Sequence, residues 1–142
     1  MRKLSVLALG MALSACVPIP RREYFAPTVS GTVVSAGVPV QNAELHLSSP
    51  FTHKMSVVST DSNGRFNVGP LRVWKLSTFL LGDRLYKYSL VIRTGSTEYP
   101  GVSAAGMGYA PPGLKILCDL SKPLPSGQTQ VYCARIGNDA VP

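Results

Sequence analysis

The sequence predicts an all-β sandwich of about seven short strands, and three observations point to it. The 142 residues include 13 glycines and 12 prolines, and so many turn-forming residues favour short strands over a helical bundle. Apolar residues make up 45% of the chain, which is enough for one globular domain with a packed core. Short segments alternate between apolar and polar side chains, as strands with one buried face do.

This alternation assigns the strands in order along the chain. The expected strands are 29–34, 43–48, 55–60, 65–68, 86–93, 114–120 and 131–136. The side chains expected to face the core in the most regular of them are Ala43, Leu45, Leu47, Phe66, Val68, Tyr86, Tyr88, Leu90 and Ile92.

Two segments do not fit a simple strand pattern. Residues 71–81 are compatible with a buried strand and a loop, or with one short helix that carries Trp74. Residues 100–113 contain seven glycines or prolines among fourteen positions. We therefore expect an irregular loop there.

The N-terminus has the features of an export signal. Residues 1–3 are positively charged, and residues 4–13 form an apolar run that is shorter than the about 20 helical residues needed to span a bilayer. A positive head followed by such a run is typical of a secretory signal peptide. The run ends in Leu13-Ser14-Ala15-Cys16, which resembles the lipobox of bacterial lipoproteins. The resemblance implies cleavage after Ala15 and acylation of Cys16; the alternative is an ordinary signal peptide with an incidental cysteine.

The expected organisation follows from this resemblance. It is a signal peptide over 1–15, a lipidated proline-rich spacer over 16–28 and a sandwich over 29–142. Two or three acyl chains anchor a protein stably to a bilayer, so a lipid bilayer is the first expected partner.

The residues after Cys16 bear on location and charge. Position 17 is Val, whereas an Asp there tends to hold enterobacterial lipoproteins in the inner membrane; the resemblance thus implies the periplasmic face of the outer membrane, with the inner membrane as the alternative. Arg21 and Arg22 could each add about 1 kcal/mol of attraction to an anionic surface, or could be solvated charges on a linker. Without the signal peptide the chain keeps 12 basic and 7 acidic residues. It shows no basic run or motif of a nucleic-acid-binding protein, so no nucleic-acid partner is expected.

Three cysteines are present, and lipidation of Cys16 leaves Cys118 and Cys133 as an even pair. Disulfides persist in exported proteins, and both residues lie in expected strands. We therefore predict a structural Cys118–Cys133 bond.

Residues 31–66 carry a resemblance to a known fold. Thr60-Asp61 is followed by Gly64 and Phe66, and the pattern Gly37-x-Pro39-Val40-x-x-Ala43 precedes them. The pattern resembles the carboxypeptidase-regulatory-like, or transthyretin-like (prealbumin-like), β-sandwich. Asp61 can accept hydrogen bonds from the turn, Gly64 can adopt positive φ, and Phe66 can enter the core. These roles are structural, so the resemblance implies a fold and no activity.

Residues for catalysis or metal binding are sparse. The two histidines, His46 and His53, lack metal-ligand spacing and are expected on the surface, although a hairpin could bring them near Asp61. No Gly-x-Ser-x-Gly elbow is present. We expect no enzyme activity, no metal and no cofactor.

The segment 100–113 is the expected contact surface, because long loops within small domains are often functional. Met107 and Tyr109 are its expected contact residues. The primary hypothesis is a membrane-anchored, non-enzymatic periplasmic lipoprotein that binds an envelope protein. The alternative is an inhibitor or immunity lipoprotein, in which the loop blocks a toxin or hydrolase.

Overall fold

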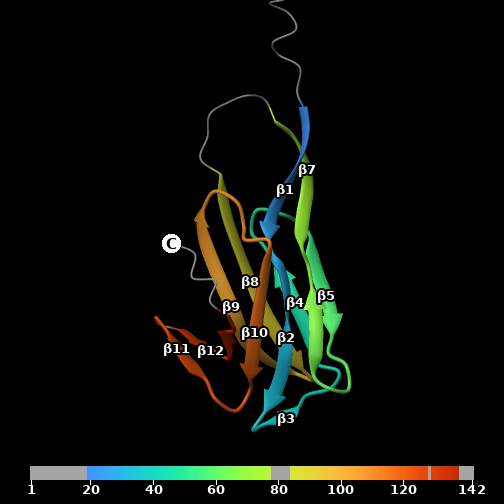
Figure 1. Ribbon diagram of the computed structural model, residues 1–142, viewed down its shortest axis with the longest axis vertical. Coiled ribbons are helices and arrows are strands. Elements are labelled where there is room, and N and C mark those ends of the chain that lie inside the picture. The colour runs from blue at the N-terminus through green and yellow to red at the C-terminus, as the bar shows by residue number, and fades with distance from the viewer. Residues whose placement is uncertain (1–18, 78–83, 128, 138–142) are drawn as a thin grey trace, which may run out of the picture.

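Two β-sheets pack face to face in the structure, a computed structural model that describes residues 19–77, 84–127 and 129–137 (Figure 1). The described residues form strands and turns and no helix, as the sequence predicts. Thirteen strands are described rather than about seven. The additional ones are the two-residue β3, the long β9, and the strands of the separate β1–β7 and β11–β12 pairs.

The first sheet has the order β13-β10-β2-β3, with β6 also paired to β2. Its strands are β2 (Thr28–Ser35), β3 (Val38–Pro39), β6 (Arg65–Val68), β10 (Gly113–Asp119) and β13 (Cys133–Arg135). β2 and β10 run parallel, whereas the other pairs in this sheet are antiparallel.

The second sheet is fully antiparallel and has the order β5-β4-β8-β9. Its strands are β4 (Glu44–Ser48), β5 (Met55–Ser59), β8 (Leu85–Thr94) and β9 (Thr97–Met107). Two smaller pairs complete the described structure: a ribbon of β1 (Ile19–Ala26) and β7 (Leu71–Ser77), and a hairpin of β11 (Leu124–Ser126) and β12 (Thr129–Val131).

The core lies between the two sheets, and the alternation in the sequence identifies its central residues. The side chains that are no more than 7% exposed include Ala43, Leu45, Leu47, Phe66, Val68, Tyr88, Leu90 and Ile92. Tyr86 is partly buried against them. The first sheet contributes Val29, Val33 and Ile116, all at 0% exposure. The predictions for β4, β6 and β8 are therefore confirmed.

The irregular loop expected over 100–113 is wrong for most of its length, because β9 extends to Met107. Its glycines serve close packing rather than turns. A Cβ on Gly101 would lie 3.0 Å from the carbonyl oxygen of Leu90, and a Cβ on Gly106 would lie 2.8 Å from the Tyr86 hydroxyl oxygen. Pro100 lies opposite Val91, beside a register shift in the β8–β9 pairing, a position that tolerates proline.

The spacer expected over 16–28 is also wrong from Ile19 onward, because residues 19–26 pair with β7. Phe25 is 6% exposed and anchors the strand against Phe51, with 6.2 Å between ring centroids. Lys75 on β7 forms an ion pair with Glu23 on β1, with 3.5 Å between Lys75 Nζ and Glu23 Oε2. Of the two alternatives for 71–81, a strand with a loop or a short helix, the structure shows a strand over 71–77. Residues 78–81 lie outside the described residues.

Candidate functional site

A groove of about 530 Å³ lies at the end of the sandwich from which the β1–β7 ribbon extends. One wall comes from β1 and the other from residues 109–112, which connect β9 to β10. The lining residues are Arg22, Tyr24, Pro27, Thr28, Pro70, Tyr109, Ala110, Pro111 and Pro112. This volume is within the range of ligand pockets.

The β1 wall is organised by the register of the ribbon. Arg22 lies directly opposite Trp74, and Tyr24 lies opposite Arg72. Opposed residues of an antiparallel pair share a face, so all four side chains project from the same side. The Arg22 guanidinium stacks 4.6 Å from the centre of the Trp74 ring, a cation–π contact that holds the arginine over the ribbon.

The opposite wall depends on a turn after β9. Gly108 has φ of +95°, and its N–H donates to the carbonyl oxygen of Arg84 at 2.6 Å. The next residue, Tyr109, is therefore held near Arg84. The Arg84 guanidinium lies 4.8 Å from the Tyr109 ring centre and donates a hydrogen bond to the Tyr109 hydroxyl. The tyrosine is thus fixed although it is 59% exposed.

Met107 lies beside the groove rather than in its lining. It pairs with Leu85 at the end of the β8–β9 hairpin, and the two side chains are 74% and 56% exposed. Together with Tyr109 they form an apolar surface next to the groove. The two predicted contact residues are thus neighbours in the structure, on a strand end and a short connection rather than on a long loop.

The charges around the groove have one sign. Arg22 lines it, and Arg84 backs Tyr109. None of the lining residues is acidic. Rigid aromatic rings, prolines and arginines are suited to binding an extended polypeptide with aromatic or acidic side chains. No nucleophile with an adjacent base is present in this lining.

The turn at Asp61 lies far from the groove, near β3 at the opposite end of the molecule (Figure 1). The Asp61 carboxylate accepts hydrogen bonds from the N–H groups of Asn63 and Arg65, both at 2.8 Å. Gly64 has φ of +71°, and Phe66 is 7% exposed in the core. These contacts stabilise the fold and contribute nothing to the groove.

The predicted disulfide is confirmed. Cys118 on β10 and Cys133 on β13 are directly paired and bonded, with exposures of 0% and 4%. The bond joins the edge strand of the first sheet to its neighbour within the core, so its role is structural.

The two histidines do not come together with Asp61 as a metal site. His46 Nε2 lies 3.1 Å from the Glu44 carboxylate on the same strand, and His53 is exposed in the β4–β5 connection. Within residues 19–77, 84–127 and 129–137, no three His, Cys, Asp or Glu side chains are grouped as metal ligands would be.

Two ionisable groups outside the groove have shifted pKa values. Burial raises the pKa of Tyr88, and its hydroxyl has no hydrogen-bond partner among the described residues. The hydrogen bond from the Ser121 hydroxyl, 2.6 Å long, is the main cause that lowers the pKa of Asp119. Both groups belong to the scaffold.

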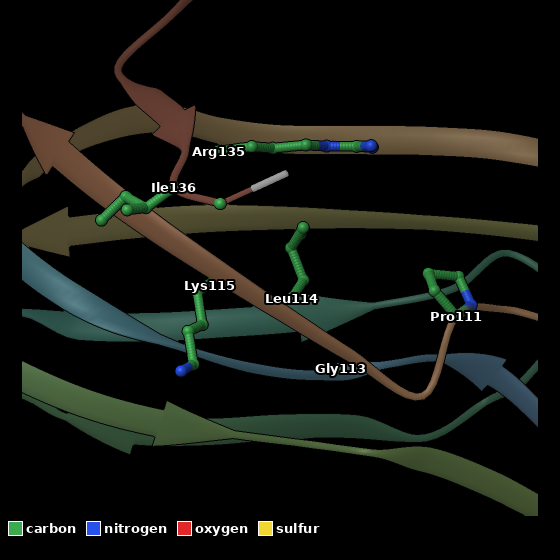
Figure 2. Close-up of a pocket in the computed structure, with 7 residues that line it drawn as sticks. Pro111, Gly113, Leu114, Lys115, Arg135 and Ile136 are labelled. Carbon is green, nitrogen blue, oxygen red and sulfur yellow. The ribbon is translucent and has the colours of Figure 1, made fainter. Parts of the chain in front are cut away.

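A second hollow, of about 40 Å³, opens at the start of β10 between Leu114, Arg135 and Ile136 (Figure 2). In Figure 2 Lys115 points to the opposite side of β10 from Arg135. The two basic side chains therefore do not converge on one ligand. The volume suits a few water molecules at most.

The predicted lipidation site, Cys16, and the signal peptide lie outside the described residues. In the part of the chain that the structure describes, no helix is long and apolar enough to cross a bilayer.

Comparisons of the chain with models of known families, with curated proteins and with solved structures found no match. The groove is therefore interpreted from its own chemistry.

The β1 wall of the groove was missed by sequence reasoning. Neither Pro20-Arg21-Arg22-Glu23-Tyr24 nor Arg72-Val73-Trp74-Lys75-Leu76 alternates between apolar and polar residues, so no local signal predicts this wall. Each segment alone reads as a linker or an ambiguous run, and only their pairing brings Arg22 and Trp74 together.

Proposed function

We propose that the protein is a lipid-anchored, non-enzymatic envelope lipoprotein that binds another envelope protein through the groove. The lipobox at 13–16 supports the anchor, and the absence of acidic side chains among the groove residues supports a partner segment with aromatic or acidic side chains. The proposed location is the periplasmic face of the outer membrane. The single observation that carries the binding role is the exposed aromatic Tyr109, held by Arg84 at the edge of a groove.

We also propose that the sandwich is transthyretin-like. The motif over residues 31–66 supports this assignment, as do the Asp61 turn and the facing sheets. Many proteins of such folds have accessory binding roles, so this assignment agrees with a binding module and specifies no partner.

The alternative role, an inhibitor or immunity lipoprotein, relied on a long loop able to enter an active site. Residues 97–107 form β9 instead, which leaves the short connection 108–112. No contact or distance in the described residues favours this alternative over the groove.

The test is the double variant Met107→Ala with Tyr109→Ala. Both side chains are exposed, so we expect the melting temperature to stay within a few degrees of wild type. Loss of one interface anchor costs about 2 kcal/mol or more, so the double variant should weaken partner capture by at least about thirtyfold. Capture is measured in intact cells as crosslinks from a photoreactive phenylalanine analogue that replaces Pro112 in the groove lining, compared between the wild-type and double-variant backgrounds. The same analogue at Arg65 on the distal β6 gives the background level.

The matched control is Met55→Ala with Val57→Ala, which removes exposed apolar side chains, 57% and 48% exposed, from β5. This control should leave capture unchanged. A double variant at Met107 and Tyr109 that captures the same partner as well as wild type contradicts the proposed role of the groove. A double variant that unfolds shows that the two side chains are core packing.

A further inference from the structure

The outer end of the β1–β7 ribbon exposes aromatic, aliphatic and basic side chains on successive residue pairs. The pairs are Pro20 with Leu76, Arg21 with Lys75 and Arg22 with Trp74. We call these six residues the ribbon tip. All six side chains are exposed, and the ribbon extends past the ends of both sheets, at the end where the described chain begins (Figure 1).

The apolar side chains of the ribbon tip share one face. Leu76 is 70% exposed and Trp74 is 61% exposed, and Pro20 lies opposite Leu76. Exposing a tryptophan and a leucine side by side is unfavourable in water. A tryptophan with its apolar ring and its polar N–H is favoured at the interface between lipid chains and headgroups.

The ribbon is also strongly basic. Its strands carry Arg21, Arg22, Arg72 and Lys75 against a single acidic residue, Glu23, so their net charge is +3. Glu23 lies 3.5 Å from Lys75, which leaves the three arginines free of carboxylate contacts within the described residues. This charge is complementary to an anionic lipid surface.

The length of the preceding chain places the ribbon tip close to the anchor. Cys16 precedes Ile19 by three residues, which can span at most about 10 Å. Electrostatic attraction in physiological salt extends over about 8 Å. An acylated Cys16 therefore holds the start of β1 within reach of the charges of the lipid headgroups.

We propose that the ribbon tip docks end-on into an anionic lipid bilayer, with Trp74 and Leu76 among the headgroups. Arg22 lies on the same face as these two side chains and Arg21 and Lys75 on the opposite face, so end-on docking brings basic side chains from both faces to lipid phosphates. This inference rests on the proposed function, because acylated Cys16 supplies the proximity. Docking orients the whole domain: the groove, which shares Arg22 with the ribbon tip, lies beside the bilayer, and the Asp61 turn points away from it.

Trp74 is the only tryptophan in the chain, so its fluorescence reports on the ribbon tip directly. The full chain is purified from membranes and reconstituted into phosphatidylcholine vesicles with or without phosphatidylglycerol, using lipids brominated in the acyl chains. Docking predicts a blue shift of the Trp74 emission and bromine quenching in the vesicles that contain phosphatidylglycerol. Quenching should decrease when phosphatidylglycerol is omitted or salt is added.

Charge variants measure the electrostatic part. Arg21→Gln and Arg22→Gln should each shift the ratio of docked to undocked ribbon about fivefold toward the undocked state. The matched control is Arg65→Gln, which removes an exposed arginine from β6 in the sandwich. It should leave the ratio unchanged, and unchanged circular dichroism shows that each variant is folded.

The mass of the N-terminal peptide shows whether Cys16 carries acyl chains, so it tests the anchor independently of docking. If Cys16 is acylated and Trp74 is not quenched in either vesicle, the ribbon tip does not dock, while the anchor stands. If Trp74 is quenched equally with and without phosphatidylglycerol and the arginine variants match Arg65→Gln, the charge-based docking is overturned. If Cys16 carries no lipid but the protein added to vesicles shows phosphatidylglycerol-dependent quenching, docking is supported and the anchor is refuted. A blue shift without quenching indicates that a second copy of the chain covers the ribbon tip, and it overturns docking on lipid.

Discussion

Gly64 shows how one residue can determine a turn. Its φ is +71°, and a Cβ at this position would lie 2.4 Å from the carbonyl oxygen of Val33. The Gly64 carbonyl in turn accepts a hydrogen bond from the Val33 N–H at 2.8 Å. The turn and β2 therefore approach so closely that only glycine fits, and this contact joins the Asp61 turn to the first sheet.

We expect Gly64→Ala to destabilise the domain by about 3 kcal/mol, because the positive φ and the backbone clash both oppose the methyl group. Gly95→Ala is the matched control, since Gly95 has φ of +60° with nothing within 4 Å of a Cβ; it should cost about 1 kcal/mol. Urea unfolding followed by circular dichroism measures both. Equal costs for the two variants would show that the close approach to Val33 is unimportant.

At the scale of strands, period-two alternation predicts β4, β6 and β8 well, because each has one face in the core and one in solvent. β9 was not predicted, since its glycines allow close approach to β8 rather than turns. A local window cannot distinguish these two uses of glycine. β1 and β7 were not predicted either, because each becomes a strand by pairing with a partner distant in sequence.

The two walls of the groove also differ in how well the sequence predicts them. Tyr109 could be predicted from composition, because an aromatic residue in a glycine- and proline-rich tract with no charge is a plausible contact residue. The opposite wall, with Arg22 and Tyr24, depends on the β1–β7 register and has no local signature. Sequence alone therefore identifies half of the groove.

The Cys118–Cys133 bond is the covalent link between β10 and β13, whose described pairing covers only three residues on each strand. Closing a loop of this length, with a sequence separation of 15, contributes about 3 kcal/mol in the chain-entropy model. We expect reduction, or the double variant Cys118→Ala with Cys133→Ala, to lower the unfolding free energy by about that amount. Denaturant titration with and without reductant measures it. Two free thiols in the denatured, unreduced protein would contradict the bond.

At the scale of the whole molecule, the two ends have different roles. One end of the sandwich consists of the Asp61 turn and β3, and the Asp61 carboxylate stabilises it by accepting backbone hydrogen bonds. The other end carries the groove, Met107 and the basic ribbon, and it is the end where the described chain begins (Figure 1). The proposed binding surface and the proposed anchor therefore share one end, so a partner segment would be bound close to the bilayer.

Because the groove and the ribbon lie at this end, acylation of Cys16 is the central prediction for the protein. We expect Cys16→Ala to abolish incorporation of a palmitate analogue and to move the protein out of the membrane fraction, because the remaining attraction of a few basic residues does not replace two or three buried acyl chains. Metabolic labelling with an alkyne palmitate, followed by fractionation of intact cells, measures both effects. The double variant Cys118→Ala with Cys133→Ala is the control, since it removes the other two cysteines and should keep the full label. Unchanged labelling of Cys16→Ala would show that the lipobox resemblance is misleading, and the groove would then have to act away from a membrane.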